Sequence, residues 1–215
     1  MKKVEVYQIL LAVAVVAIIV LLVKPVGCPE RAEEPQVVAE NPQVVNAAQW
    51  RQIDPKEIAD NPVALINEDW LALASGKEGD MNAMTISWGG IGVLWGKPVV
   101  TVYVSTDRHT FGFMERNDYF TVTAFPEQHR AKLQYIGSHS GRDGDKIKGA
   151  GLTVEYTEQG NPTFTDGRLM IECRKIYSQQ FDPARFNDDA RRIYSNGMGI
   201  HHLYIGEMVN VWVKE

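Results

Sequence analysis

Groups that could hold a flat, polar-edged ring lie close together between residues 82 and 90. Asn82, Thr85 and Ser87 supply short hydrogen-bonding side chains, and Trp88 could form a wall against the face of a ring. The two glycines that follow let a backbone pass closely. An irregular stretch here would also offer main-chain N–H and C=O groups, which can meet a polar ring edge without adding charge.

Groups that could hold a phosphate follow further along the chain. The segment STDRHT ends a predicted strand and opens a predicted helix, so Ser105, Arg108 and Thr110 would stand beside free helix amides. The loop GSHSGRDGDK adds Ser140 and Lys146. Each piece alone also fits an ordinary strand surface, a solvated charge or a plain turn. The DGD in the loop suits calcium, but no later ligand completes the spacing of a calcium loop.

Composition excludes several classes of protein. The chain has 215 residues and a formal net charge of -5, so nucleic-acid binding through a basic surface is not expected. An anion must instead be held by a local pocket. The two cysteines, Cys28 and Cys173, cannot build a disulfide framework, and no Cys/His cluster has the spacing of a structural zinc site.

Residues 1–28 are predicted to be a signal peptide or a membrane anchor. Two lysines precede a wholly apolar run over residues 9–23. As a helix this run spans about 22 Å, which is short of the ~30 Å hydrocarbon core and suits a signal-peptide core at least as well as a membrane span. Gly27-Cys28 could be a lipoprotein-type cleavage and acylation site, although Pro25 and Lys24 are unusual there.

Two readings of this segment stay open: export with lipidation of Cys28, and an uncleaved single anchor. Both place the protein at a membrane or on its periplasmic or extracytoplasmic face. A cytoplasmic protein with a buried N-terminal helix is the third reading.

Residues 29–49 are predicted to be a flexible linker, and residues 50–215 a folded domain. The linker is rich in Pro, Glu, Gln and Val and has no period that would bury a face.

In the domain, apolar residues alternate, for example over 99–105 and 119–125. Strands predominate at irregular spacing, which predicts an antiparallel barrel with short helices outside it. The expected strands are 70–74, 99–105, 119–125, 169–177 and 204–213, with SGKEGD as a loop; helices are expected at Asp54-Pro55, 110–116, 127–135 and 188–194.

Several motifs in a fixed order resemble the flavin reductase-like proteins, which include the flavoredoxins. The resemblance covers nearly all of residues 53–215. The segments that carry it are DWLALASG, NAMTISWGGIGVLWGKPVV, DRHTFGFMERNDYFTV, GSHSGRDGDK, LMIECRKIY and HHLYIGEMV.

The resemblance implies an FMN-binding split β-barrel that forms a homodimer, with FMN near the subunit interface. The family's flavin-contacting strip falls on Met84, Thr85, Ile86, Ser87 and Trp88, beside Asn82. Its phosphate-contacting positions fall on Arg108 and Thr110, with Ser105, Ser140 and Lys146 less securely placed. No metal is implied.

The histidine before the last strand corresponds to His201. In the family this region lies near the flavin or the approach of the nicotinamide, so His201 is the candidate catalytic residue. A barrel-edge histidine with satisfied hydrogen bonds is the other reading. Relatives often carry a cysteine before Gly137, where this chain has Ile136, and an aromatic residue where it has Met81.

The resemblance implies an oxidoreductase that passes electrons from NAD(P)H to flavin or another acceptor. The N-terminal segment suggests an alternative, because free nicotinamide is scarce outside the cytoplasm. That alternative is a membrane-tethered FMN electron carrier that takes electrons from a redox protein partner. A binding module that has lost FMN is the third possibility.

Overall fold

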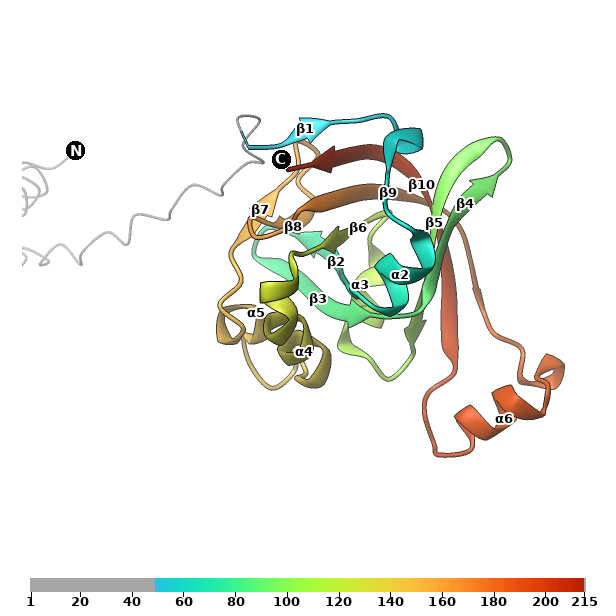
Figure 1. Cartoon of the computed structure of the whole chain (residues 1–215). Coiled ribbons are helices and arrows are strands. Elements are labelled where there is room, and N and C mark those ends of the chain that lie inside the picture. The colour runs from blue at the N-terminus through green and yellow to red at the C-terminus, as the bar shows by residue number, and fades with distance from the viewer. Residues whose placement is uncertain (1–48, 215) are drawn as a thin grey trace, which may run out of the picture. The chain divides into compact units, whose positions relative to one another are not determined.

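Antiparallel strands build most of the domain in the computed structural model, which describes residues 49–214 (Figure 1). The predicted targeting segment with Cys28, and all of the predicted linker except its last residue, lie outside the described residues. One sheet contains β1 (Arg51–Gln52), β2 (Leu71–Lys77), β3 (Asp80–Ile86), β4 (Gly89–Leu94), β5 (Lys97–Ser105), β6 (Tyr119–Ala124), β9 (Leu169–Gln180) and β10 (His201–Val213). A separate hairpin is formed by β7 (Val154–Tyr156) and β8 (Pro162–Phe164).

The strand order β3-β2-β6-β9-β10-β5-β4 leaves β3 and β4 at the two ends of this path. Ser87 and Trp88 connect them directly in the chain. In the described sheet, β3 pairs only with β2 and β4 only with β5, so each keeps one open backbone edge. This is the split in the barrel, and it leaves main-chain groups unpaired beside the connection.

The two faces of each strand enter different cores. Leu71 and Leu73 of β2 belong to the barrel interior, whereas Ala72 and Ala74 pack outside it against helices. This is the two-residue period of a strand buried on both faces. The alternation predicted for residues 99–105 and 119–125 is confirmed, because the barrel interior includes Val100, Val102, Val104, Phe120, Val122 and Ala124.

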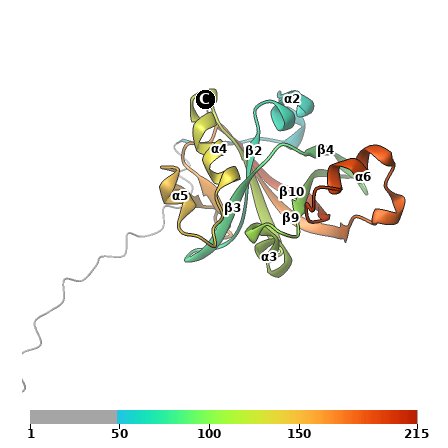
Figure 2. The same ribbon diagram turned by 90° about the horizontal axis from the view of Figure 1, so that it is seen from below.

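Short helices cover the outside of the barrel. Figures 1 and 2 show α4 and α5 together on one side, and α6 on the opposite side. α6 belongs to an arm, residues 181–200, that connects β9 to β10 and projects from the barrel (Figure 1). The helices are α2 (Pro62–Asn67), α3 (His109–Arg116), α4 (Arg130–Ser138), α5 (Lys146–Gly149) and α6 (Asp188–Tyr194), with 3-10 turns η1 (Pro55–Glu57), η2 (Glu127–His129) and η3 (Pro183–Arg185).

The predicted fold class, a mainly β domain with short helices around an antiparallel split barrel, is confirmed. Every expected strand and helix is present, with small shifts at the ends. Asp54 does cap the turn that begins at Pro55, and it accepts a hydrogen bond from the Lys56 amide at 2.8 Å. Within residues 49–214, no helix is both long enough and apolar enough to cross a bilayer.

The prediction of a loop over SGKEGD is wrong. β2 continues to Lys77 and β3 begins at Asp80, which leaves only Glu78 and Gly79 as the turn. The Lys77 ammonium donates to Gln159 O at 2.8 Å and to Asn161 Oδ1 at 2.7 Å, and these bonds hold the end of the strand. The stretch from Asn82, which we expected to be irregular, is therefore the edge strand β3.

Candidate functional site

A cavity of about 300 Å³ lies beside the end of β3 and the connection to β4. We call it the β3-edge cavity. β5 and the turn before α3 form a second wall, and the end of the arm with the start of β10 forms a third. Its lining residues are Met84, Thr85, Ile86, Ser87, Trp88, Tyr103, Ser105, Asp107, Arg108, Met198 and His201.

Most of the residues predicted from the sequence meet in this cavity. Met84 to Trp88, Ser105, Arg108 and His201 all line it. Asn82 and Lys146 line a second, neighbouring cavity, whereas Thr110 and Ser140 line neither of these two cavities. The sequence therefore predicted the main wall of the β3-edge cavity. Four other residues of the prediction, Asn82, Thr110, Ser140 and Lys146, do not line it.

The Thr85 hydroxyl is already engaged, because it donates to the Leu133 carbonyl of α4. α4 lies tightly against this point of β3. A Cβ added to Gly137 would stand 3.1 Å from Thr85 Cβ. The groups that this part of β3 offers to the cavity are therefore those of its open main-chain edge rather than the Thr85 hydroxyl that we expected to contribute.

Arg108 caps α3 in an extended conformation, and its guanidinium donates to Gly137 O at 3.0 Å. The positive charge of Arg108 lowers the pKa of His201 and of Lys146, and in each case burial lowers that pKa more. Arg142 stands close by and donates to Asp107 O at 3.0 Å. These cations make the turn before α3 an attractive place for an anion.

Ser105 and Asp107 tie the arm to the turn. The Ser105 hydroxyl donates to Gly199 O at 3.1 Å, and the Gly199 amide donates to Asp107 Oδ2 at 2.6 Å. A Cβ on Gly199 would lie 2.5 Å from that same oxygen, so a larger residue here would displace the exposed Asp107 carboxylate from its bond. The Ser105 hydroxyl, which we expected at a phosphate, is used to position the arm.

His201 is 8% exposed and stands between Trp88 and Tyr194. Its ring centroid lies 5.1 Å from that of Trp88, and its Nδ1 lies 2.9 Å from the Tyr194 hydroxyl. Burial, assisted by Arg108 and opposed by Asp107, lowers the pKa of His201, so the imidazole is neutral at neutral pH. Burial raises the pKa of Tyr194, opposed by a hydrogen bond with the His201 backbone, so Tyr194 remains a phenol.

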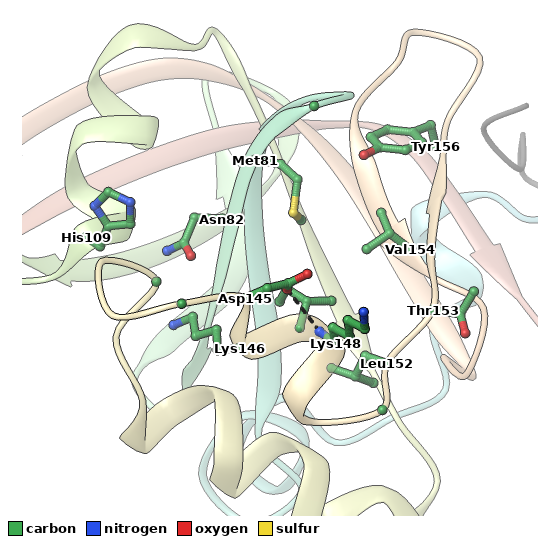
Figure 3. Close-up of a pocket in the computed structure, with 15 residues that line it drawn as sticks. Met81, Asn82, His109, Asp145, Lys146, Lys148, Leu152, Thr153, Val154 and Tyr156 are labelled. Carbon is green, nitrogen blue, oxygen red and sulfur yellow. Dashed lines mark hydrogen bonds between the residues drawn. The ribbon is translucent and has the colours of Figure 1, made fainter. Parts of the chain in front are cut away.

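A larger cavity of about 650 Å³, which we call the Lys146 cavity, is lined by the loop over residues 139–145, by α5 and by β7. Figure 3 shows Asn82, His109 and Lys146 at one side of it, and Tyr156 with Val154 at the other. The cavity is thus polar and basic on the side that adjoins the turn before α3.

The residues of this polar side hold one another. Asn82 is 4% exposed and donates to Thr110 Oγ1 at 2.7 Å, so the buried Thr110 supports Asn82 rather than lining a cavity. Ser140 accepts from the Arg142 amide at 3.1 Å and shapes the loop. Both hydroxyls accept in these bonds and keep their own proton to donate, so a direct contact of Thr110 and Ser140 with a phosphate stays a prediction.

Lys146 is the first residue of α5, rather than part of the loop as expected. Its ammonium donates to Ile136 O at 2.9 Å and to His139 O at 3.0 Å. Burial, followed by the charge of Arg108, lowers the pKa of Lys146 to about 8. A third N–H of the ammonium is left by these two bonds.

Sequence reasoning missed four contributors: Tyr103, Asp107 and Met198, which line the β3-edge cavity, and Tyr194 behind His201. Alternation along residues 99–105 places Tyr103 on the face opposite the valines, which was a usable signal. Met198 and Tyr194 belong to the arm, whose path has no sequence signal. Among residues 49–214, no group of three or more His, Cys, Asp or Glu side chains could hold a metal ion.

Comparison with known families decides the relationship of the chain. The model of the flavin reductase like domain matches residues 69–215. The chain belongs to the flavin reductase-like domain family. A search of curated proteins found no significant match.

Solved structures share this flavin reductase-like fold. Flavoredoxin from Methanosarcina acetivorans is 22% identical, with a TM-score of 0.55 over 68% of this chain and 69% of that chain. An FMN-binding domain of a flavin reductase-like enzyme from Shewanella baltica is 17% identical, with a TM-score of 0.56 over 77% of each chain. FMN-binding protein from Thermus thermophilus is 21% identical, with a TM-score of 0.56 over 76% of this chain and 78% of that chain. At these identities the likeness shows the fold.

Proposed function

We propose that this flavin reductase-like domain binds FMN in the β3-edge cavity and transfers electrons through it. The observation that carries the proposal is the meeting of an open strand edge, an exposed Trp88, the Arg108 guanidinium and His201 around one cavity of about 300 Å³. These are the groups that a polar-edged ring with a phosphorylated tail requires. FMN-binding proteins among the structural neighbours support the same assignment.

The residues present fit the ring. The main chain from Met84 to Ser87 adds no charge and keeps one edge without a strand partner in the described sheet. Trp88 is 45% exposed, which leaves its indole able to pack against a planar group. When bound, FMN would supply the reversible uptake and release of electrons, while the chain binds the ring, limits its access to water and leaves an approach for the electron donor or acceptor.

The residues present also fit a phosphate. Arg108 would bind it, with Arg142 and Lys146 adding positive charge close by. Lys146 and Asn82 line the Lys146 cavity beside the loop over residues 139–145, so we place them at the tail end of the site. Thr110 and Ser140 would support this end through Asn82 and through the shape of the loop.

His201 would hold a proton at the open side of the cavity. With Tyr194 donating its hydroxyl proton to Nδ1, the neutral imidazole of His201 carries its own proton on Nε2. An Nε2–H group there can donate a hydrogen bond to a flavin edge or to an incoming partner. Tyr194 is thus a positioning residue for His201.

We propose NAD(P)H as the electron donor, and a homodimer as the assembled form. The competing function is a membrane-tethered FMN carrier that receives electrons from a redox protein. One observation favours this alternative: the apolar run over residues 9–23 predicts attachment to a membrane or export. We propose such attachment for the full chain, through a helical anchor or a lipid on Cys28.

One experiment tests cofactor and donor together: an anaerobic absorbance spectrum of the detergent-extracted full chain, before and after NADPH is added. We expect a yellow protein whose flavin absorbance is bleached by NADPH. A yellow protein that NADPH leaves oxidised, but that a redox protein reduces, supports the carrier. A colourless protein that takes up no added FMN rejects both.

A further inference from the structure

The three most exposed large apolar side chains of residues 49–214 are Val93, Val63 and Trp95, at 76%, 72% and 68% exposure. Val93 and Trp95 lie at the end of the β4–β5 hairpin, and we call them the apolar tip. Val63 lies on α2, the helix that packs against β4. Val63 lies on another element, so the apolar tip is the one place of these three where two large apolar side chains are exposed within three residues of each other.

The turn at the apolar tip places a bulky tryptophan where the backbone has a positive φ. Trp95 and Gly96 connect β4 to β5, and both have positive φ, at 52° and 72°. Two-residue turns of this kind favour Asn or Asp before Gly, because a bulky side chain is strained there. Trp70 also has positive φ, but the guanidinium of Arg130 lies 3.3 Å from the centroid of its ring. Within residues 49–214, no hydrogen bond or ring contact involves the Trp95 side chain.

The tip lies on the side of the barrel where the chain enters the domain. β5 pairs with β10 from His201 to Glu207, and β1 pairs with the same edge of β10 a few residues further on, at Trp212 and Val213. In Figure 1 the β4–β5 hairpin and β1 both lie toward the top of the barrel, and the arm projects from the bottom. His201 and Ser105 of the β3-edge cavity pair at the opposite end of this ladder.

We propose that the apolar tip inserts into the interfacial layer of a phospholipid bilayer and thereby turns the β3-edge cavity away from the membrane. The inference rests on the membrane attachment proposed above. Trp is favoured at this depth because its ring is apolar and its N–H stays hydrated. Lys97, which directly follows the turn, and Arg174 each lie 2.6 Å from Glu207, and together they leave a net positive charge next to the apolar tip, which suits a lipid surface.

The length of chain outside the described domain explains why a second contact matters. Residues 24–48 separate the apolar run from the domain. The sequence predicts a flexible linker over most of this segment, which would span roughly 25–30 Å on average and would set no orientation by itself. A second, weak contact would be strengthened by the high effective concentration of the tethered domain, and two residues could then suffice.

The test is quenching of tryptophan fluorescence by bilayers whose acyl chains carry bromine. The full chain is reconstituted into nanodiscs of brominated and unbrominated phosphatidylcholine, as wild type, Trp95→Phe, Trp95→Asn and Trp88→Phe. We expect both Trp95 variants to lose most of the quenching seen in the wild type. Trp88→Phe is the matched control, since it removes the exposed tryptophan at the opposite end, and its quenched fraction should not fall.

Trp95→Asn separates membrane contact from folding. Asn before Gly suits the turn, so this variant should keep or raise the thermal midpoint while it loses quenching. Equal quenching in wild type and both Trp95 variants, with the protein bound to nanodiscs, overturns the inference and leaves attachment intact. Failure of the full chain to associate with nanodiscs overturns attachment and the inference together. Burial of Trp95 against a second copy would also overturn it, and would appear as crosslinking between tips without quenching.

Discussion

The positive charge of Arg108 affects two other titratable residues of the site. Arg108 lines the β3-edge cavity, bonds the Gly137 carbonyl, and lowers the pKa of both His201 and Lys146. A phosphate bound beside Arg108 would reverse this effect on its neighbours, because a negative charge favours the protonated forms of lysine and histidine. The two cavities are therefore coupled electrostatically.

The pH dependence of FMN binding follows from Lys146. Its pKa in the folded protein is about 8, so it is charged below that pH and neutral above it. The charged form favours the phosphate, and FMN affinity should therefore fall as pH rises from 7 to 9, by up to about tenfold, or ~1.4 kcal/mol. Fluorescence titration of FMN at each pH measures it.

Lys146→Met should bind FMN more weakly at pH 7 and lose this pH dependence. Lys56→Met, an exposed lysine of η1 at the other end of the barrel, is the matched control and should titrate like the wild type. An unchanged pH dependence in Lys146→Met would show that Lys146 does not sense the phosphate.

At the scale of single residues, the sequence predicted which residues line the cavity better than it predicted which group each side chain bonds. The strip from Met84 to Trp88, Arg108 and His201 does line one cavity. The hydroxyls of Thr85 and Ser105 instead donate to Leu133 and Gly199, and that of Thr110 accepts from Asn82. A hydroxyl in a motif signals a hydrogen bond but not its partner, because the partner depends on which distant segment packs against it.

Among the elements, β10 carries the most constraints, since it pairs with β9, β5 and β1. A register shift against β9 falls between Ile205 and Gly206. A Cβ at Gly206 would lie 2.6 Å from Cys173 Cβ and from Phe120 Cζ, both of which are buried. Only glycine lets β10 pass this close to Cys173 of β9 and Phe120 of β6.

Gly206→Ala should therefore destabilise the domain by about 1–3 kcal/mol, because the new methyl group overpacks the barrel interior. Urea unfolding followed by circular dichroism measures the change. Gly92→Ala is the control, since a Cβ there meets nothing within 4 Å, and its stability should stay close to the wild type. Equal urea midpoints for both variants would show that the barrel accommodates a methyl group at residue 206 without loss of stability.

Strong alternation predicted the central strands well, because β5 and β6 bury valine, phenylalanine and alanine on one face. β3, β4 and the β7–β8 hairpin were not predicted. β4 contains three glycines, Gly89, Gly90 and Gly92, which hide its strand character, and in the described sheet its single partner is β5, the next strand along the chain. β7 and β8 are three residues each, too short for a period to show.

On the scale of the whole molecule, the fold was predicted from an ordered set of motifs, and the family model over residues 69–215 agrees with it. The arm was not foreseen, although α6 was. Its return to the barrel depends on contacts between distant segments, such as Gly199 with Asp107 and Tyr194 with His201. No local pattern in the sequence encodes such pairs. The predicted boundaries at residues 28 and 49 stay predictions.

The central claim is that the β3-edge cavity binds FMN with its phosphate at Arg108. The most direct measurement is the dissociation constant of FMN and of riboflavin, which lacks the phosphate, for the wild type and Arg108→Ala. The account predicts that Arg108→Ala weakens FMN binding about 10- to 100-fold, as expected for a lost charge-assisted hydrogen bond, and leaves riboflavin binding unchanged. Unchanged FMN affinity, or an equal loss for both ligands, would contradict it.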